Sequence, residues 1–588
     1  MAKTKKLTGR KRDERITAYM FVAPAVILLI AFLVVPMIYT VYFSGFKYQI
    51  MRPDAIKFIG LENYQKLFSD KNFWIALKNT VYFTVLVVPI QCALALGLAL
   101  LVSKKFRGVS IFRTMYFSPQ LTSMVVIAVL WSVLYNANPN TGLINSLLVS
   151  LGMEPIKFLS DADTAMNSII FMSAWQGAGY QMMIFLAGLQ GIPKDQYEAA
   201  AVDGATKFKQ FLYITLPGLK GTIKYVVMIT MIQAMKLFTQ PYIMTQGGPK
   251  NSTKTLVYYI YTQGFQKGNF GYACSIAAVF FVIVVNVVHG NEKSYSGYRL
   301  RKEDMVMTKS MKFSAKFGKF MFYFGNIVIG IIFVSPLIWM ISASLKPEAK
   351  IFADMDSLAT FLPIQASLDN YAEVFSRLNM PQVFKNTLLY IGLILIFDLL
   401  VNSMCGYALA KFDFKGKGAI MNLVIALMVL PMEAIMLPLY IEMSQLGWVN
   451  TLPALVVPFI AKCFSIYMFR QFFCDVPDEL IEAAAIDGCS PAGTFFKIVV
   501  PISKTVYATV FILDFVAHWN DFMWPFLVMT GEDKRTIQLA VQSFFGTQPV
   551  HYSAIMAALV VSAIPMIIMF IFMQKYYVEG IASSGIKG

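Results

Sequence analysis

No phosphate-binding loop is present in the 588 residues of this chain. The pattern G-x-x-x-x-G-K-[ST] cradles the phosphates of a nucleotide with backbone N–H groups and a lysine. The segment from Gly264 to Gly271 contains glycines but lacks the Lys-Ser/Thr ending. The chain therefore cannot hydrolyse ATP by that mechanism, and any energy taken from ATP must come from another protein.

Cysteine and histidine are also scarce. The three histidines lie far apart without the spacing of metal ligands, and none of the six cysteines is in a CxxC pair. Most cysteines lie in or beside apolar runs, where a thiol acts as a small packing residue. No paired carboxylates or Ser/His/Asp arrangement stand out. We predict no metal site, no cofactor in this chain and no enzymatic activity. The cysteines are Cys92, Cys274, Cys405, Cys463, Cys474 and Cys489, and the histidines are His289, His518 and His551.

Charged residues make up only 14% of the chain, whereas 57% of the residues are hydrophobic. Many apolar stretches are long enough to cross a hydrocarbon core of about 30 Å. The formal charge of +17 does not indicate nucleic-acid binding, because the basic residues cluster at the ends of apolar runs, as in membrane proteins. We predict an integral membrane protein in contact with lipid and no nucleic-acid partner.

The apolar runs predict an all-α membrane protein with about twelve transmembrane helices in two groups of six. The basic segment from Met1 to Arg15 precedes a long apolar run without a small-residue cleavage site, which favours a retained first helix over a signal peptide. The first group covers 18–43, 75–102, 110–135, 166–190, 222–244 and 273–290. The second group covers 317–342, 382–410, 418–443, 453–474, 505–529 and 552–574.

Lysine and arginine determine the predicted orientation. The basic N-terminal tail is placed in the cytoplasm, and alternation then places residues 104–107, residues 411–417 and the C-terminus there as well. The loop at 44–72 is an exception among the outer loops, because it carries bases among acidic residues; we interpret it as a small extracytoplasmic cap. The predicted location is a bacterial-type plasma membrane with both termini cytoplasmic.

One polar segment of the first half recurs in the second half. Glu198-Ala-Ala-Ala-Val-Asp-Gly-Ala-Thr is followed 284 positions later by Glu482-Ala-Ala-Ala-Ile-Asp-Gly-Cys-Ser. Each copy leads with the same spacing to a hydrophobic-Pro stop, at Pro217 and Pro501, and lies on the side predicted to be cytoplasmic. A repeat with matched surroundings indicates a duplicated membrane unit.

The duplication predicts a first domain at 1–290 and a second domain at 317–588, joined by a polar, basic cytoplasmic junction at 291–316. Within that junction, Met307-Thr-Lys-Ser-Met-Lys is typical of the start of a separate polypeptide. The sequence is compatible with a natural fusion, an engineered fusion or two polypeptides joined end to end.

Each repeated loop, at 193–217 and 477–501, is predicted to form a short helix outside the bilayer. A proline suits the first turn, Glu-Ala-Ala-Ala is a strong helix former, and Gly204 and Gly488 are free to take the left-handed cap conformation. Such a helix is small enough to dock in a groove on another protein. One copy alone is compatible with an ordinary polar connector; two copies with equal spacing argue against that interpretation.

The two loops resemble the EAA loops of the membrane subunits of binding-protein-dependent ABC importers. The first half also carries Met244-Thr-Gln-Gly-Gly-Pro and Phe270-Gly-Tyr-Ala, which resemble the first permease of carbohydrate importers of the maltose and multiple-sugar type. The second half carries Asn402-Ser-Met-Cys-Gly-Tyr-Ala, Trp519-Asn-Asp-Phe-Met-Trp-Pro and Gly580-Ile-Ala-Ser-Ser-Gly, which are similar to the second permease. The resemblance extends over nearly the whole chain.

This resemblance implies two six-helix type I importer domains that form the translocation pathway of an ATP-driven carbohydrate importer. It implies two ABC ATPase subunits that bind ATP and Mg²⁺, and an extracytoplasmic solute-binding protein that delivers the sugar. By the same resemblance, the residues at the joint with the ATPase subunits are Glu198, Ala199, Asp203, Gly204, Glu482, Ala483, Asp487 and Gly488.

Polar residues inside membrane helices form a candidate substrate path. One helix face carries Ser173, Gln176, Gly177 and Tyr180 at i, i+3, i+4, i+7 spacing. Their hydroxyl, amide and aromatic groups suit a sugar. A later helix is predicted to carry Gln233, Lys236 and Gln240 on one face, and Asn520 is predicted in the middle of another helix. Each could instead bond helix to helix, and the lysine could reach the outer headgroups. The residues are Ser173, Gln176, Gly177, Tyr180, Gln233, Lys236, Gln240 and Asn520.

A proton- or ion-coupled secondary sugar transporter is the alternative, because such proteins often have twelve helices in two halves. It needs buried carboxylates or histidines along its path. The membrane helices offer few candidates, namely Asp398, Asp514, Asp521 and His518. This alternative also leaves the doubled loop unexplained.

Overall fold

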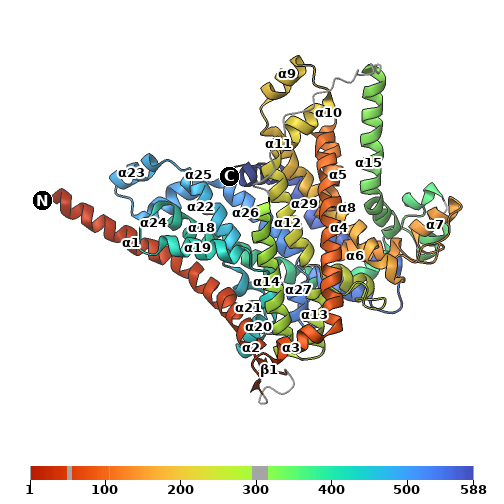
Figure 1. Cartoon of the computed structure of the whole chain (residues 1–588), viewed down its shortest axis with the longest axis horizontal. Helices are drawn as coiled ribbons and strands as arrows, with labels where there is room; N and C mark the ends of the chain where they lie inside the picture. The colour runs from red at the N-terminus through yellow and green to blue at the C-terminus, as the bar shows by residue number, and fades with distance from the viewer. Residues whose placement is uncertain (1, 50–55, 105, 295–314, 356, 587–588) are drawn as a thin grey trace.

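The computed structural model describes residues 2–49, 56–104, 106–294, 315–355 and 357–586. Most of this part is helical (Figure 1), so the predicted all-α fold is confirmed. The one sheet in the described residues is a two-stranded antiparallel hairpin of β1 (Phe46–Lys47) and β2 (Lys57–Phe58), with Phe46 opposite Phe58. This hairpin lies in the loop predicted as a small cap.

In the first half, short helices lie in the segments that connect the long helices. The helices are α1 (Ala2–Leu29), α2 (Val35–Ser44), α3 (Glu62–Ser69), α4 (Lys71–Val102), α5 (Val109–Leu121), α6 (Met124–Leu134), α7 (Leu143–Ser150), α8 (Ala162–Gln190), α9 (Lys194–Val202), α10 (Lys207–Gln210), α11 (Leu216–Gly218), α12 (Lys220–Met235), α13 (Leu256–Tyr261) and α14 (Phe270–Ser294). Short π-helical segments lie at Ile30–Val34, Phe211–Thr215, Pro241–Thr245 and Thr262–Gln266.

The second half repeats this order of long and short helices. The helices are α15 (Ala315–Ser344), α16 (Glu348–Ala353), α17 (Asp369–Arg377), α18 (Met380–Lys411), α19 (Lys417–Met428), α20 (Met432–Gln445), α21 (Leu452–Val456), α22 (Cys463–Cys474), α23 (Asp478–Ile486), α24 (Pro491–Thr494), α25 (Val500–Ile502), α26 (Lys504–Trp519), α27 (Met523–Val528), α28 (Ile537–Phe545) and α29 (Tyr552–Ile586). Further short turns lie at Leu358–Phe361, Val457–Phe459, Phe495–Val499 and Glu532–Lys534.

Six helices of the described chain are long and apolar enough to cross a membrane, and ten spans result if each of four bent helix pairs counts as one. Two predicted segments are missing from that set, α8 and α12. The amides and hydroxyls of α8 lower its hydropathy, and α12 has only 16 residues. Adding these two helices gives the twelve predicted segments, so two six-helix domains describe the chain.

The prediction of one continuous helix per segment is wrong for several segments. The segment 110–135 bends by 93° between α5 and α6, where the Ser123 hydroxyl accepts a hydrogen bond from the Val126 N–H and starts a new helix. The segment 418–443 bends by 104° before α20, where Pro431 has no N–H to donate. The segments 453–474 and 505–529 are also broken. Short polar or proline breaks inside apolar runs are the cause.

The two halves match element by element. α4 and α18 have 32 residues each, α12 and α26 have 16, and α9 and α23 have nine. Side-chain contacts repeat as well. The Thr80 hydroxyl accepts the Leu256 N–H at 2.9 Å in the first half, and the Thr387 hydroxyl accepts the Ile537 N–H at 3.0 Å in the second. The duplication seen in the loop sequence therefore extends through the fold.

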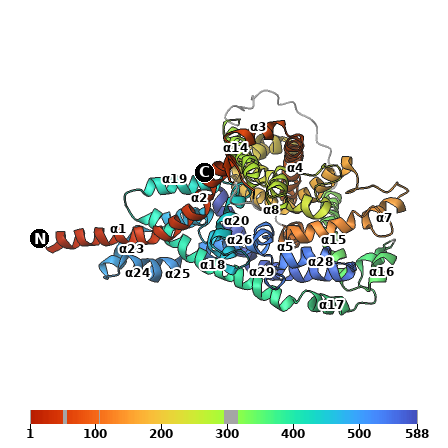
Figure 2. The same cartoon turned by 90° about the horizontal axis from the view of Figure 1, so that it is seen from below.

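The first helices are exchanged between the halves. α1 packs on α18 of the second half, and α15 packs on α5 of the first half (Figure 1). Phe21 lies against Phe495 with ring centroids 5.2 Å apart, and the Tyr116 hydroxyl donates to the Asn326 carbonyl at 3.1 Å. Seen from below, α1 reaches out beside α23 and α24 (Figure 2). Each half therefore contributes its first helix to the packing of the other half.

Candidate functional site: a polar cavity and two loop helices

The helix α8 is buried along most of its length although it carries many polar side chains. It packs most extensively against α4, and glycines allow close approach. A Cβ on Gly179 would overlap the Tyr116 carbonyl oxygen and lie 2.9 Å from the Phe117 Cα, so α5 crosses α8 at this residue. This packing holds the polar face of α8 toward the interior of the first half.

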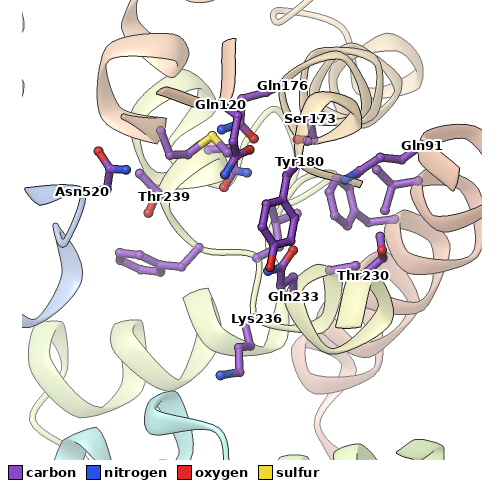
Figure 3. Close-up of a pocket in the computed structure, with 18 of the residues that line it drawn as sticks. Gln91, Gln120, Ser173, Gln176, Tyr180, Thr230, Gln233, Lys236, Thr239 and Asn520 are labelled. Atoms are coloured by element: carbon purple, nitrogen blue, oxygen red, sulfur yellow. The ribbon is translucent and has the colours of Figure 1, made fainter. Parts of the chain in front are cut away.

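A cavity of about 330 Å³, here called the first-half cavity, lies beside α8. Helices α4, α8 and α12, the bend between α5 and α6 and the segment after α12 line it, together with Asn520 of the second half (Figure 3). All eight candidate substrate-path residues lie in its lining, namely Ser173, Gln176, Gly177, Tyr180, Gln233, Lys236, Gln240 and Asn520. The structure thus brings together residues that are up to about 350 positions apart in the sequence.

Three of these residues are not placed as the sequence predicts. α12 ends at Met235, so Lys236 is its C-cap and Gln240 lies on the next segment rather than on the same helix face. A lysine at a helix C-terminus is favourable because it faces the negative end of the helix dipole. Asn520 is the C-cap of α26 rather than a mid-helix residue. Asparagine favours such a position because its side chain competes for backbone hydrogen bonds.

Polar atoms in the lining are free to bind a ligand. The Oγ of Ser173 and the Oδ1 of Asn520 are buried and have no hydrogen-bond partner within the described part of the chain. Gln176 and the ring of Tyr180 lie between them (Figure 3). Unsatisfied buried polar atoms are costly in a protein interior. A ligand with several hydroxyl groups would satisfy these atoms, and the Tyr180 ring offers a flat apolar surface.

The sequence reasoning missed further polar residues of the lining. Gln91 was detectable, because it interrupts an otherwise apolar stretch of α4, and a polar residue in a membrane helix is a functional candidate. Gln120 and Thr122 were hidden by the assumption that 110–135 is one straight helix. The additional polar residues are Gln91, Gln120, Thr122, Thr230 and Thr239.

The repeated loops form the predicted short helices, α9 and α23, here called the loop helices. Gly204 and Gly488 follow them with φ of 76° and 82°, in the left-handed region that favours glycine. The loop helices project from the body at separate places (Figure 1). The side chain of Val202 is 88% exposed, and its equivalent Ile486 is 85% exposed. The two loop helices therefore share an exposed apolar side chain at matched positions.

The residues predicted at the ATPase joint lie on or directly after the loop helices. Glu198 and Ala199 are in α9, and Glu482 and Ala483 are in α23. Asp203 and Asp487 are the C-caps, and the two glycines follow. Because α8 leads into α9 and the chain then returns to α12, the first loop connects two helices that line the first-half cavity.

The second loop helix is fastened more firmly than the first. The Lys411 ammonium, at the end of α18, donates to the Asp478 carboxylate and to the Val476 carbonyl, each at 2.6 Å. Position 478 corresponds to Lys194 in the first loop, which cannot make this ion pair. The first loop is held instead by a hydrogen bond of 2.9 Å between the Tyr197 and Thr215 hydroxyls.

The ionisable residues considered for an ion-coupled path lie in the second half and not in the lining of the first-half cavity. The Asp514 carboxylate pairs with the Lys462 ammonium and accepts a 3.2 Å hydrogen bond from Ser465. The Asp398 carboxylate accepts a 2.6 Å hydrogen bond from Asn402. In the first half, Thr230 occupies the position of Asp514 and Gln181 that of Ser465, and these two uncharged side chains are hydrogen-bonded to each other. No metal-binding cluster occurs among the described residues.

Such a fold, with many membrane helices, a buried polar cavity and paired loop helices, defines a membrane transport protein. Residues 91–290 and 402–583 both match the family described as the binding-protein-dependent transport system inner membrane component. These two matches cover more than half of the chain. The chain belongs to this family and carries two copies of its domain, and it is therefore a multi-pass membrane protein.

Related proteins match one half of the chain at a time. The arabinooligosaccharides transport system permease protein AraQ of Halalkalibacterium halodurans is 34% identical over 265 residues, which cover 45% of this chain and 95% of that protein. The lactose transport system permease protein LacF of Rhizobium radiobacter is 36% identical over 280 residues, which cover 47% and 92%. The chain is therefore similar to two permeases in tandem.

Among solved structures, the chain is similar to one in the crystal structure of a bacterial alginate ABC transporter in complex with alginate pentasaccharide-bound periplasmic protein. The TM-score is 0.42 and the sequence identity is 24%, over 48% of this chain and 94% of that chain.

Proposed function

We propose that this chain forms the translocation pathway of an ATP-driven carbohydrate importer. The observation that carries the proposal is the direct connection between the exposed loop helix α9 and the two helices, α8 and α12, that line a hydroxyl- and amide-rich cavity. The relatives named above are an arabinooligosaccharides and a lactose transport system permease, which supports carbohydrate as the substrate class.

The loop helices each dock on one ATPase subunit. Val202 and Ile486 insert into apolar grooves of these subunits, while Glu198 and Glu482 lie at the rim. The ATPase subunits bind ATP and Mg²⁺, which this chain lacks the phosphate loop to bind. Both termini lie on the cytoplasmic side with the loop helices.

The chain transmits the movement of the ATPase subunits to the cavity. An extracytoplasmic solute-binding protein delivers the sugar to the outer side of the membrane. Closure of the ATPase pair moves α9 and α23, and the helices joined to them swing between inward-facing and outward-facing arrangements. Ser173, Gln176, Tyr180 and Asn520 contact sugar hydroxyls during passage.

Co-purification of the ATPase subunits tests the docking role. We expect Val202→Asp and Ile486→Asp each to reduce recovery of ATPase subunits with the permease at least tenfold, because a carboxylate would have to be buried in an apolar groove. Leu358→Asp is the matched control, since Leu358 is 83% exposed but lies away from the loops. Normal recovery with both loop variants would overturn the docking role.

Uptake into proteoliposomes tests the importer function. We expect Glu198→Ala and Gly488→Pro to leave ATP hydrolysis in the complex but to abolish its coupling to sugar uptake; proline cannot adopt the φ of 82° found at Gly488. Unchanged uptake in both variants counts against the coupling role. Sugar uptake by this chain alone, driven by a proton gradient, would instead establish the secondary-transporter alternative.

A further inference from the structure

The first-half cavity has a single charge in its lining. Among the described lining residues, only Lys236 carries a full charge at neutral pH, and eleven others have uncharged amide or hydroxyl side chains, the phenol of Tyr180 included. The Lys236 ammonium points away from Tyr180 and Gln176 (Figure 3). It lies 3.5 Å from the Oε2 of Glu433, on α20 of the second half. The charge is thus neutralised by the opposite half.

The ends of two helices favour this ion pair. Lys236 is the C-cap of α12, where the helix dipole is negative, and Glu433 lies in the first turn of α20, where it is positive. The side chains are only 28% and 19% exposed, so water screens their attraction less than at an open surface. The Oε2 of Glu433 accepts no hydrogen bond within the described residues, which leaves Lys236 as its one cationic partner there.

The duplication shows that the fold does not require this pair. The residue equivalent to Lys236 is Asn520, the C-cap of α26, and 520 is 236 plus the repeat distance of 284. Glu433 is the second residue of α20, and Val125 is the second residue of α6, the equivalent helix. Asn520 and Val125 carry no charge, so the equivalent helix end forms without an ion pair. Asn520 also lines the first-half cavity, and the ion pair therefore places charge on one side of this cavity only, which points to a role in what the cavity accepts.

We propose that the Lys236–Glu433 ion pair selects uncharged saccharides over saccharides that carry carboxylates. This inference rests on the carbohydrate-importer function proposed above. Glu433 balances the charge of Lys236, so the cavity presents no net positive charge to a carboxylate, and its other polar groups are amides and hydroxyls that suit sugar hydroxyl groups. An acidic sugar would bring an unpaired carboxylate against Glu433 or would have to displace it from Lys236, and burial of an unpaired charge is costly.

Binding to the purified complex with its ATPase subunits, without the solute-binding protein, tests the proposal. Maltotriose and arabinotriose serve as neutral probes and trigalacturonate as the acidic probe, with affinities from isothermal titration calorimetry. We expect the unmodified complex to bind a neutral probe at least tenfold more tightly than trigalacturonate. Glu433→Gln leaves the Lys236 ammonium free for a carboxylate, and we expect it to shift the affinity ratio toward trigalacturonate by on the order of tenfold or more.

Two controls separate specificity from folding. Glu532→Gln also removes the carboxylate of an ion pair, with Arg535 at 3.0 Å, but outside the cavity, and we expect the ratio to stay unchanged. The exchanged pair Lys236→Glu with Glu433→Lys keeps the lining neutral, and we expect it to restore the preference for neutral probes.

Equal binding of trigalacturonate and neutral probes by the unmodified complex would overturn the proposal, as would an unchanged ratio in Glu433→Gln or no binding of any probe. Failure of the proposed function has a separate signature, namely loss of ATP-dependent uptake for every sugar supplied with the solute-binding protein.

Discussion

Gly177 and Gly179 are two residues apart on α8 and face different surroundings. A Cβ on Gly177 would meet the side-chain amide of Gln91 in the first-half cavity, whereas a Cβ on Gly179 would meet the backbone of α5. A side-chain amide can rotate away, but a packed backbone cannot do so without moving a helix. The two glycines therefore separate a role in the cavity from a role in packing.

We expect Gly177→Ala to raise the KM for sugar uptake several-fold with little change in thermal stability, because it displaces Gln91 and narrows the cavity. Gly179→Ala is the matched variant, and we expect it to lower the free energy of unfolding by about 1–3 kcal/mol through overpacking. Uptake kinetics and thermal unfolding of the purified proteins measure the two effects. Loss of stability in Gly177→Ala with unchanged KM would assign this glycine to packing.

At Glu373, on α17 outside the predicted spans, stability depends on pH. Partial burial raises the pKa of this carboxyl, but hydrogen bonds from Arg377 at 2.7 Å and with His551 at 2.8 Å outweigh burial and hold the pKa below its usual value. A lowered folded-state pKa contributes stability above the unfolded pKa of about 4.3, and this contribution is lost as the pH falls through the folded pKa.

We therefore expect Glu373→Gln to be less stable than the unmodified protein at neutral pH, by up to about 1 kcal/mol for a partly exposed pair. The difference should shrink as the pH falls below about 4. Thermal unfolding between neutral and acidic pH measures it. A difference that is constant over this range, or that grows in acid, contradicts the role assigned to the carboxylate.

At the scale of elements, the two loop helices share one design but differ in their attachment. The ion pair of Lys411 with Asp478 ties α23 to the end of α18, and the first loop has lysine at the equivalent position. A hydrogen-bonded tie of this kind transmits a displacement of the loop helix directly to a membrane helix. The second loop therefore has an attachment to a membrane helix that the first loop lacks.

We expect Asp478→Ala to lower the amount of sugar transported per ATP hydrolysed, by about two- to tenfold for the loss of one charge-assisted hydrogen bond. Lys194→Ala is the matched control in the first loop and should leave this ratio unchanged. Simultaneous measurement of uptake and phosphate release in proteoliposomes gives the ratio. An equal effect of both substitutions would show that the attachment of α23 does not matter.

Sequence reasoning was most reliable where the physical signal is local. The duplicated loop, its proline start and its glycine end are encoded within the short ranges 193–204 and 477–488, and α9 and α23 form as predicted. The bends at Thr122-Ser123 and Leu430-Pro431 were not predicted, because each run stays apolar enough on average to be taken as one membrane span. The partner of Lys236 could not be predicted, because Glu433 reaches it only through packing of the two halves.

At the scale of the whole molecule, exchanged first helices hold the two halves together. α1 and α2 of the first half pack on α18 and α20 of the second, and α15 packs on α5 and α29. The Thr40 hydroxyl donates to the Ala434 carbonyl at 3.2 Å across this boundary. The two halves are therefore held together by packing and hydrogen bonds as well as by the covalent connection.

We expect residues 1–290 and 317–588, expressed together as separate polypeptides, to assemble, because the contacts between them resemble a protein interior. Purification through a tag on either part should recover the other in equal amount. Deletion of residues 2–44 should abolish recovery, since it removes α1 and α2. Recovery of only the tagged part from the undeleted pair would show that the linkage itself is required.

The exchange of first helices also has a consequence for biosynthesis. The Tyr19 hydroxyl donates to the Lys415 carbonyl at 3.0 Å, across 396 positions of sequence. During translation α1 enters the membrane long before its partner helices are made, at a synthesis rate on the order of 5–20 residues per second. For about 20 seconds or more, lipid or an insertion chaperone must cover the face of Ala18, Phe21 and Ala25 that the second half later buries. In a nascent chain arrested before residue 415, this face of α1 would stay exposed to other membrane proteins.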